Sequence, residues 1–326
     1  EHLESFSDAA HPIGEAQRVN EWVVKNHGAQ FRGAGRGVAD EDSKAQRRDE
    51  LESLRQDLGM YQASGITLHA QQQGGGAELS LDDPDPQATI ESIVTQRLVP
   101  ELELAYFGVH FGPTELTTTP DLQTIDWINW AGLAAKAARP DLPIFINNHT
   151  TGSQPTENLG DLGCPTNTND NNRADYYDLA FHTDPSLGIQ VHTVMFYPLE
   201  GAAPVYGQVS FEHKLCLMQK ASEAGRPLLY FPEGSWWLSF DNAVPLYLPI
   251  YTHSRGRDIE LIKPLLASRG EGSLVGHKMF NSGHEWGYWQ QDYAVGLWHF
   301  NADVSLQEAL HEMTDPLCDP ERFPER

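Results

Sequence analysis

Residues 188–234 contain two apolar runs separated by a helical pattern: GIQVHTVMFYPLEGAAPVYGQVSFEHKLCLMQKASEAGRPLLYFPEG. GIQVHTVMFYP (188–198) and PLLYFPEG (227–234) are continuous apolar runs rather than alternating ones, which is typical of strands that are covered on both faces. Between them, FEHKLCLMQKASEAG (211–225) places Phe211, Leu215 and Met218 on one face of a predicted helix. The stretch therefore predicts one strand, helix, strand unit.

The same alternation extends along most of the chain. Further strands are expected at GITLHA (65–70), ELAYFGVHFGP (103–113), PIFINNHTTG (143–152), GSLVGHKMFNSG (272–283) and, as a candidate, AVGLWHF (294–300). Helices are expected at 43–61, 86–98, 123–140, 173–181 and 304–313. Residues 242–270 contain VPLYLPIY, which has strand composition, but they follow the preceding strand so closely that a loop and a helix are preferred.

This repeat predicts an α/β protein with a (β/α)8 TIM-type barrel. Seven strands are predicted above, and the N-terminal region is where an eighth is expected. A doubly wound open sheet is the alternative, and the lack of a GxGxxG turn counts against its dinucleotide-binding version. Residues 1–40 are expected to form an N-terminal extension or a partial first barrel unit, and residues 41–326 the barrel domain.

The composition restricts the partners. A formal net charge of -24 repels phosphate backbones, so neither nucleic acid nor an anionic membrane is expected as a partner. No apolar run reaches the roughly 20 residues of a membrane span. The three cysteines are too few for a disulfide framework, although one bridge is left open. The sequence starts at Glu1 without methionine or a signal-like segment, and we expect a secreted or periplasmic location.

Polar residues collect where the predicted strands end. In a barrel these ends line one mouth, where the active sites of this fold are built. Glu233 and Glu285 are each followed within four residues by Trp or Tyr, and five of the eight tryptophans lie in residues 236–298. The strand-end residues are His69, His110, Asn148, His149, Glu200, Glu233, His284 and Glu285.

Paired carboxylates at one mouth favour cleavage of a glycosidic bond, which needs an acid and a second carboxylate that attacks or activates water. Glu233 and Glu285 are the expected pair, with Glu200 in reserve. Trp236, Trp237, Trp286 and Trp289 are expected to stack on sugar rings, and the strand-end histidines and Asn148 to contact the carbohydrate. The alternative is that these aromatic residues are structural and that the glutamates pair with Arg255 or Arg257.

PEGSWWLSFDNAVPLYLPIYTHSRGRD (232–258) followed by GHEWGYW (283–289) resembles segments of bacterial (β/α)8 glycoside hydrolases. The resemblance implies a barrel over about residues 60–315 and hydrolysis of a carbohydrate. The Asn-Glu pair that carries the acid in one large clan of that superfamily is missing, because Leu199 precedes Glu200 and Pro232 precedes Glu233. Which glutamate is the acid therefore stays open.

Two other readings involve metals. His69, His110 and His149 follow successive strands, and three imidazoles with a carboxylate suit a catalytic zinc, as in a metal-dependent sugar isomerase or deacetylase. The chain has no HxH or HExxH at these positions, so no metal or other cofactor is expected. CPTNTNDNNRAD (164–175) is rich in oxygen ligands for calcium but lacks the pattern of an EF-hand, which favours an ordinary loop. A non-catalytic carbohydrate-binding barrel is the last alternative.

Overall fold

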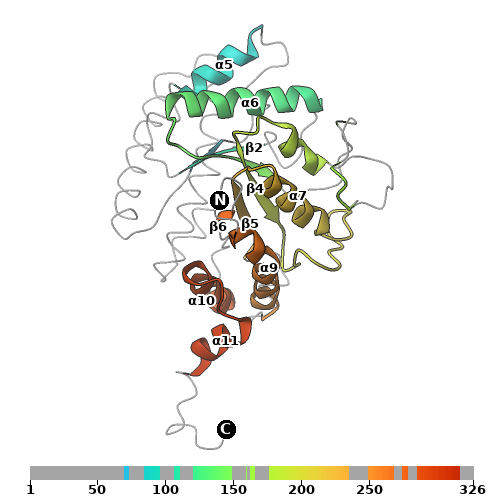
Figure 1. Ribbon diagram of the computed structural model, residues 1–326, viewed down its shortest axis with the longest axis vertical. Coiled ribbons are helices and arrows are strands. Elements are labelled where there is room, and N and C mark those ends of the chain that lie inside the picture. Colours follow the sequence, from blue (N-terminus) through green and yellow to red (C-terminus); the bar gives the residue numbers. More distant parts are fainter. Residues whose placement is uncertain are drawn as a thin grey trace, which may run out of the picture.

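The computed structural model describes residues 70–72, 84–95, 106–110, 120–148, 159, 162–165, 176–234, 249–267, 274–277 and 285–315. These residues form a parallel sheet with helices packed against it (Figure 1). Helices α5 and α6 lie on the side of β2, and α9, α10 and α11 lie on the side of β6. No helix in the described ranges has the length and apolarity to cross a membrane.

The described part of the sheet contains six strands, each parallel to its neighbours. They lie side by side in the order in which they occur along the chain: β1 (Ala70–Gln72), β2 (Phe107–His110), β3 (Ile144–Asn148), β4 (Gly188–Thr193), β5 (Leu228–Pro232) and β6 (Leu274–His277). The predicted α/β class with a parallel sheet is confirmed. The winding never reverses within the described strands, unlike the order of a Rossmann sheet.

Helices connect most of these strands, as parallel pairing requires. The helical elements are α5 (Pro86–Ile93), α6 (Asp121–Ala138), the 3-10 helix η4 (Tyr176–His182), α7 (Glu212–Glu223), α9 (Pro249–Ala267), α10 (Glu285–Phe300) and α11 (Leu306–Thr314). The preference for a helix in residues 242–270 is confirmed by α9, which begins at a proline and contains Pro264 in its interior. Residues 1–69, including the helix predicted at 43–61, lie outside the described residues.

The strand proposed at 294–300 is wrong, because these residues form the last part of α10. Buried Gln291, Ala294, Val295 and Trp298 recur at helical spacing, so the apolar run is one stripe of a helix rather than a strand. The position of β1 also differs from the prediction, since it begins at Ala70, the last residue of GITLHA. Short apolar runs fit either element, which explains the first error.

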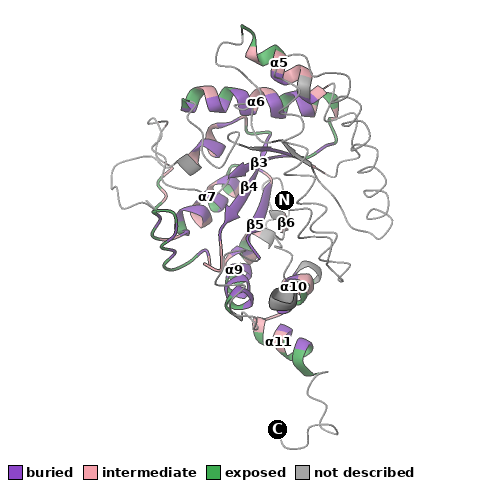
Figure 2. Cartoon of the chain, turned by 180° about the vertical axis from the view of Figure 1, so that it is seen from behind, coloured by how far each residue is buried: buried purple, intermediate pink, exposed green. Residues whose placement is uncertain are grey.

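Strands β3, β4 and β5 are buried along their whole length (Figure 2), as their continuous apolar runs predicted. Successive side chains point to opposite faces. On one face, Val191 and Tyr230 belong to the main core together with Leu217 of α7 and Ile259 of α9. This is the helix-covered face. The opposite face carries several polar side chains and is described with the site below.

One disulfide joins Cys164 to Cys216 of α7 across 52 residues of sequence. The cysteine count allowed one such bridge. Most of the candidate calcium loop, residues 166–175, lies outside the described residues.

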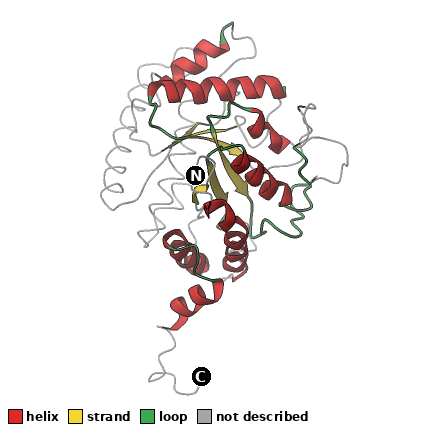
Figure 3. Ribbon diagram, viewed as in Figure 1, coloured by secondary structure: helices red, strands yellow, loops and turns green. Residues whose placement is uncertain are grey.

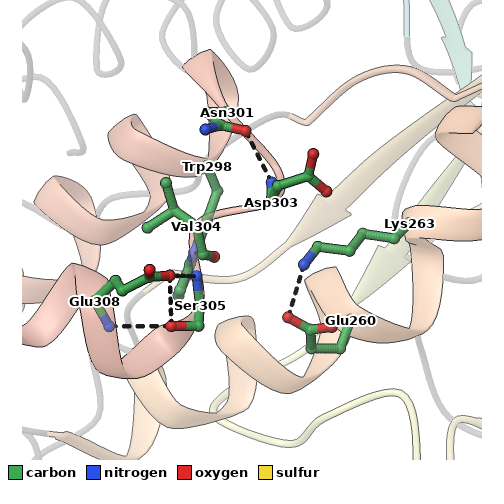
Figure 4. A network of polar contacts seen from close by, with 8 residues as sticks. All are labelled: Glu260, Lys263, Trp298, Asn301, Asp303, Val304, Ser305 and Glu308. Carbon is green, nitrogen blue, oxygen red and sulfur yellow. Dashed lines mark hydrogen bonds and ion pairs between the residues drawn. The ribbon is translucent and has the colours of Figure 1, made fainter.

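The turn between α10 and α11 is held by a compact polar network (Figure 4). Trp298 Nε1 donates to the Val304 carbonyl at 3.0 Å, and the Trp298 side chain is buried. Ser305 begins α11 with a capping box, in which its Oγ accepts from Glu308 N at 3.1 Å and its own N–H donates to Glu308 Oε2 at 2.8 Å. The backbone N–H and the hydroxyl of Ser305 both donate to the Glu308 carboxylate and hold its pKa below the ordinary value. Trp298 is therefore a structural anchor.

Candidate active site at the carboxyl end of the sheet

Glu233 lies where the sequence predicted a catalytic carboxylate, immediately after β5. Its backbone N–H donates to the Thr193 carbonyl at 2.9 Å, so Glu233 is fixed to the end of the neighbouring strand β4. Its side chain is almost enclosed, since only 5% of the residue is exposed. A carboxylate in such a position must be compensated by nearby donors or charges, because burying an isolated charge is very unfavourable.

Two groups from β4 and the loop that follows it face the two oxygens of this carboxylate. Oε2 accepts a hydrogen bond of 2.6 Å from the backbone N–H of Met195. Oε1 lies 3.8 Å from Nε2 of His192, which is 2% exposed. The His192 ring packs on Phe231 with the two ring centroids 4.9 Å apart. A backbone donor and an imidazole therefore flank Glu233 on the same side of the sheet.

The donor at Met195 depends on an unusual backbone conformation. Met195 has a φ of 57°, in the left-handed region that residues other than glycine seldom adopt. Such a conformation costs on the order of 1 kcal/mol and persists only where the surroundings impose it. Here the turn directs the Met195 N–H towards the carboxylate of Glu233. The strained backbone and the N–H that binds Glu233 therefore belong to the same residue, and backbone strain is common at functional sites.

Further polar side chains continue this face of the sheet towards β3. Gln190 Nε2 donates to Asn147 Oδ1 at 3.0 Å, and both residues are buried. Asn147 and Gln190 are paired in register, and His192 follows Gln190 by two positions, so all three share one face. We call Asn147, Gln190, His192 and Glu233 the polar face. Buried hydrogen-bonding groups of this kind can orient a polar ligand.

The predicted site residues near β2 and β3 are placed differently. Asn148 lies on the helix-covered face, where both its backbone carbonyl and its Oδ1 accept from Nζ of Lys214 in α7. Asn147, one position earlier, is the residue that belongs to the polar face. His110 ends β2 and is in register with Asn147. His69 and His149 lie outside the described residues.

Glu200 lies in the loop between β4 and α7, which Figure 3 draws in green among the described loops. Its side chain is half exposed and forms an ion pair of 2.7 Å with Arg257. The alternative reading paired Glu233 or Glu285 with Arg255 or Arg257, but the described partner of Arg257 is Glu200. Arg255 instead pairs with Asp258 at 3.2 Å.

Glu285 is the first residue of α10 and not the end of a strand, which corrects the pattern of strand, carboxylate and aromatic residue assumed for it. Trp286 and Trp289 lie in the first turns of the same helix. Because α10 follows β6, Glu285 still belongs to the connection after the strand that neighbours β5. Trp236, Trp237 and His284 lie outside the described residues.

No group of three or more potential metal ligands is found among the described residues. Since His69 and His149 are not among them, the three-histidine arrangement remains a prediction.

The sequence analysis missed His192, Gln190, Asn147 and the donor at Met195. A signal for two of these was present, because Gln190 and His192 are polar residues two positions apart inside an apolar strand, which puts both on one face. The N–H of Met195 had no signal, since its role depends on a backbone angle and on contact with a residue 38 positions away.

No protein-family model and no curated protein matches the sequence. The structure is similar to that of a glucosidase from Croceicoccus marinus with a TM-score of 0.35 and 12% identity, over 69% of this chain and 44% of the glucosidase chain. It is also similar to 7,8-dihydropteroate synthase from Vibrio fischeri ES114 with a TM-score of 0.26 and 12% identity, over 72% and 81% of the two chains. This chain thus spans less than half of the glucosidase, and both similarities are distant ones of fold.

Proposed function

We propose that the chain is a glycoside hydrolase of the (β/α)8-barrel type in which Glu233 is a catalytic carboxylate. The observation that supports this most is the position of Glu233: it is enclosed at the carboxyl end of β5, accepts from the N–H of Met195 and lies beside His192. Active sites of α/β proteins with parallel strands lie at this end of the sheet.

The order of the strands supports the barrel. Six parallel strands follow one another without a reversal, and right-handed crossovers then place the connecting helices on one face of the sheet. The polar face is the opposite one, and it would be enclosed if the sheet closed on itself. In a barrel it would form the interior, with Glu233 at the mouth.

The geometry around Glu233 suits a catalytic carboxylate that must be held in one orientation. Its Oε2 accepts a hydrogen bond of 2.6 Å from the backbone N–H of Met195, and fixed placement of a reacting group favours the chemical step. We therefore assign Glu233 as nucleophile or base and Glu285, at the start of α10, as acid. Their carboxyl groups would be about 5 to 5.5 Å apart in a retaining enzyme and about 6.5 to 9.5 Å apart in an inverting one.

Carbohydrate would be held by amide groups and by aromatic rings. Asn147, Gln190 and His192 offer hydrogen-bonding groups for sugar hydroxyls on the polar face. Trp236, Trp237, Trp286 and Trp289 stay the proposed stacking residues, and His69, His110, His149 and His284 stay proposed contacts. The Cys164–Cys216 bridge supports a secreted or periplasmic location, because disulfides persist in oxidising compartments.

The test is a screen of the purified chain against aryl glycosides and natural glycans, with and without a chelator. We expect release of reducing sugar that the chelator does not abolish. Activity that requires a divalent ion, or isomerisation or deacetylation in place of cleavage, would favour the metal-dependent alternative. Saturable glycan binding without any turnover would favour the carbohydrate-binding barrel. A chain that neither binds nor cleaves any of these glycans would contradict the proposal.

A further inference from the structure

A second buried polar cluster lies behind the site, between β5 and α9 on the helix-covered face. Tyr230 of β5 donates its hydroxyl hydrogen to Asp258 Oδ2 at 2.7 Å, and Arg255 NH2 lies 3.2 Å from the same oxygen. All three residues are fully buried or nearly so. We call Tyr230, Asp258 and Arg255 the buried anchor.

The buried anchor binds the loop that leaves β4 at two points. Asp258 Oδ1 accepts from the backbone N–H of Leu199 at 2.7 Å, and Arg255 NH2 donates to the Tyr197 carbonyl at 2.8 Å. Tyr230 adds a contact at the start of the loop, where its hydroxyl lies 3.3 Å from Thr193 Oγ1. The segment from Thr193 to Leu199 is therefore fixed at both ends, and Met195 lies inside it.

Such a cluster is a costly way to stabilise a fold. Arg255 Nε and NH1 are buried and have no hydrogen-bond partner among the described residues, and burial raises the pKa of Asp258 against the opposing effect of Arg255. An apolar group of similar volume would commonly be as stable or more so. Buried groups left unsatisfied in this way call for an explanation other than stability.

We infer that the buried anchor positions the catalytic carboxylate: by holding residues 193–199 it imposes the left-handed turn at Met195, whose N–H then fixes Glu233. The strain at Met195 supports this, since a left-handed methionine needs a surrounding structure that imposes it. The inference rests on the proposed role of Glu233. Tyr230, Asp258 and Arg255 are positioning residues in this account, because they act through the loop and not on substrate.

The experiment uses the full chain labelled with ¹⁵N-methionine, which gives at most five amide signals from five methionines. Met195→Leu identifies the Met195 signal, and Glu233→Gln shows how far that signal moves when the charged acceptor is lost. Tyr230→Phe removes only the anchor hydroxyl. Thr183→Val is the matched control, because it removes a buried hydroxyl bonded to Ala180 O and Arg226 at the amino end of β4.

We expect Tyr230→Phe to move the Met195 signal in the same direction as Glu233→Gln and Thr183→Val to leave it in place. With a glycoside that the screen identifies, kcat should fall by about tenfold or more in Tyr230→Phe with little change in KM, because misplacement of a catalytic group slows the chemical step. Arg255→Lys should act in the same way and serves as a second variant if Tyr230→Phe does not fold.

An unchanged Met195 signal in folded Tyr230→Phe and Arg255→Lys would overturn the inference, even if Glu233→Gln abolished turnover. An equal displacement in Thr183→Val would also overturn it, since the effect would then be one of general stability. If the Met195 signal moves as expected but no glycoside is cleaved, the link from the buried anchor to Glu233 stands and the glycosidase proposal fails.

Discussion

Lys214 is fully buried on α7, although lysine is one of the residue types least often enclosed. Its Nζ donates to the backbone carbonyl of Asn148 at 2.9 Å and also to Asn148 Oδ1. The sequence predicted the helix with Phe211, Leu215 and Met218 on one face; Phe211 and Met218 are buried in the core, and the partly buried Leu215 packs against it. The sequence could not predict the burial of Lys214, because its partner Asn148 lies 66 positions away, on strand β3.

Lys214→Met should lower the free energy of unfolding by about 1 to 3 kcal/mol, since the acceptors on Asn148 lose a buried donor while the length of the side chain is kept. Lys136→Met is the matched control: Lys136 also donates to a backbone carbonyl, that of Ser186 at 3.2 Å, but at the surface. We expect a change within about 0.5 kcal/mol there. Denaturant unfolding measures both, and equal stability of the two variants would contradict the interpretation.

The surroundings of Glu233 were predictable only in part. The position of Glu233 after a strand follows from the apolar run and the turn residues beside it. Its partners depend on the register of β4 and β5, which aligns His192 with Phe231. No local pattern encodes that register, so the sequence led to Asn148 and Glu200, which form structural contacts with Lys214 and Arg257.

At the scale of elements, the repeat of apolar runs and helical stripes located β2 to β6 and most of the helical elements close to their observed positions, namely α5, α6, η4, α7, α9 and α11. The error at α10 arose because a short apolar run fits either a strand or one face of a helix. One disulfide joins Cys164, which lies in a loop, to Cys216 of α7, and the pattern of elements could not relate these two segments.

Breaking this disulfide should destabilise the fold substantially. Cys216→Ser opens a loop closed over 52 residues, for which the chain-entropy relation gives about 4 kcal/mol. Cys318→Ser is the control, because Cys318 takes no part in this bridge. Thermal melts should show a large fall in Tm for the first variant and almost none for the second. A thiol titration of the denatured wild type should find one free cysteine, and three would refute the bridge.

For the whole molecule, the order of the strands decides where chemistry can occur. All carboxyl ends of the parallel strands lie at one edge, so residues far apart in sequence, such as His192 and Glu233, meet there. The sequence predicted this edge correctly from the alternation of elements alone. The sequence did not predict that α9 supports the site. This support depends on contacts of Asp258 and Arg255 with the loop after β4.

The proposed role of Glu233 is tested most directly by the turnover of Glu233→Gln beside that of Glu200→Gln on one glycoside. Gln keeps the shape of the side chain but not its charge, so kcat should fall by about 10²-fold or more at Glu233, while substrate affinity stays within a fewfold. The exposed Glu200, which forms an ion pair with Arg257, should retain nearly full activity in the same assay. Equal activity of Glu233→Gln and the wild type would contradict the account.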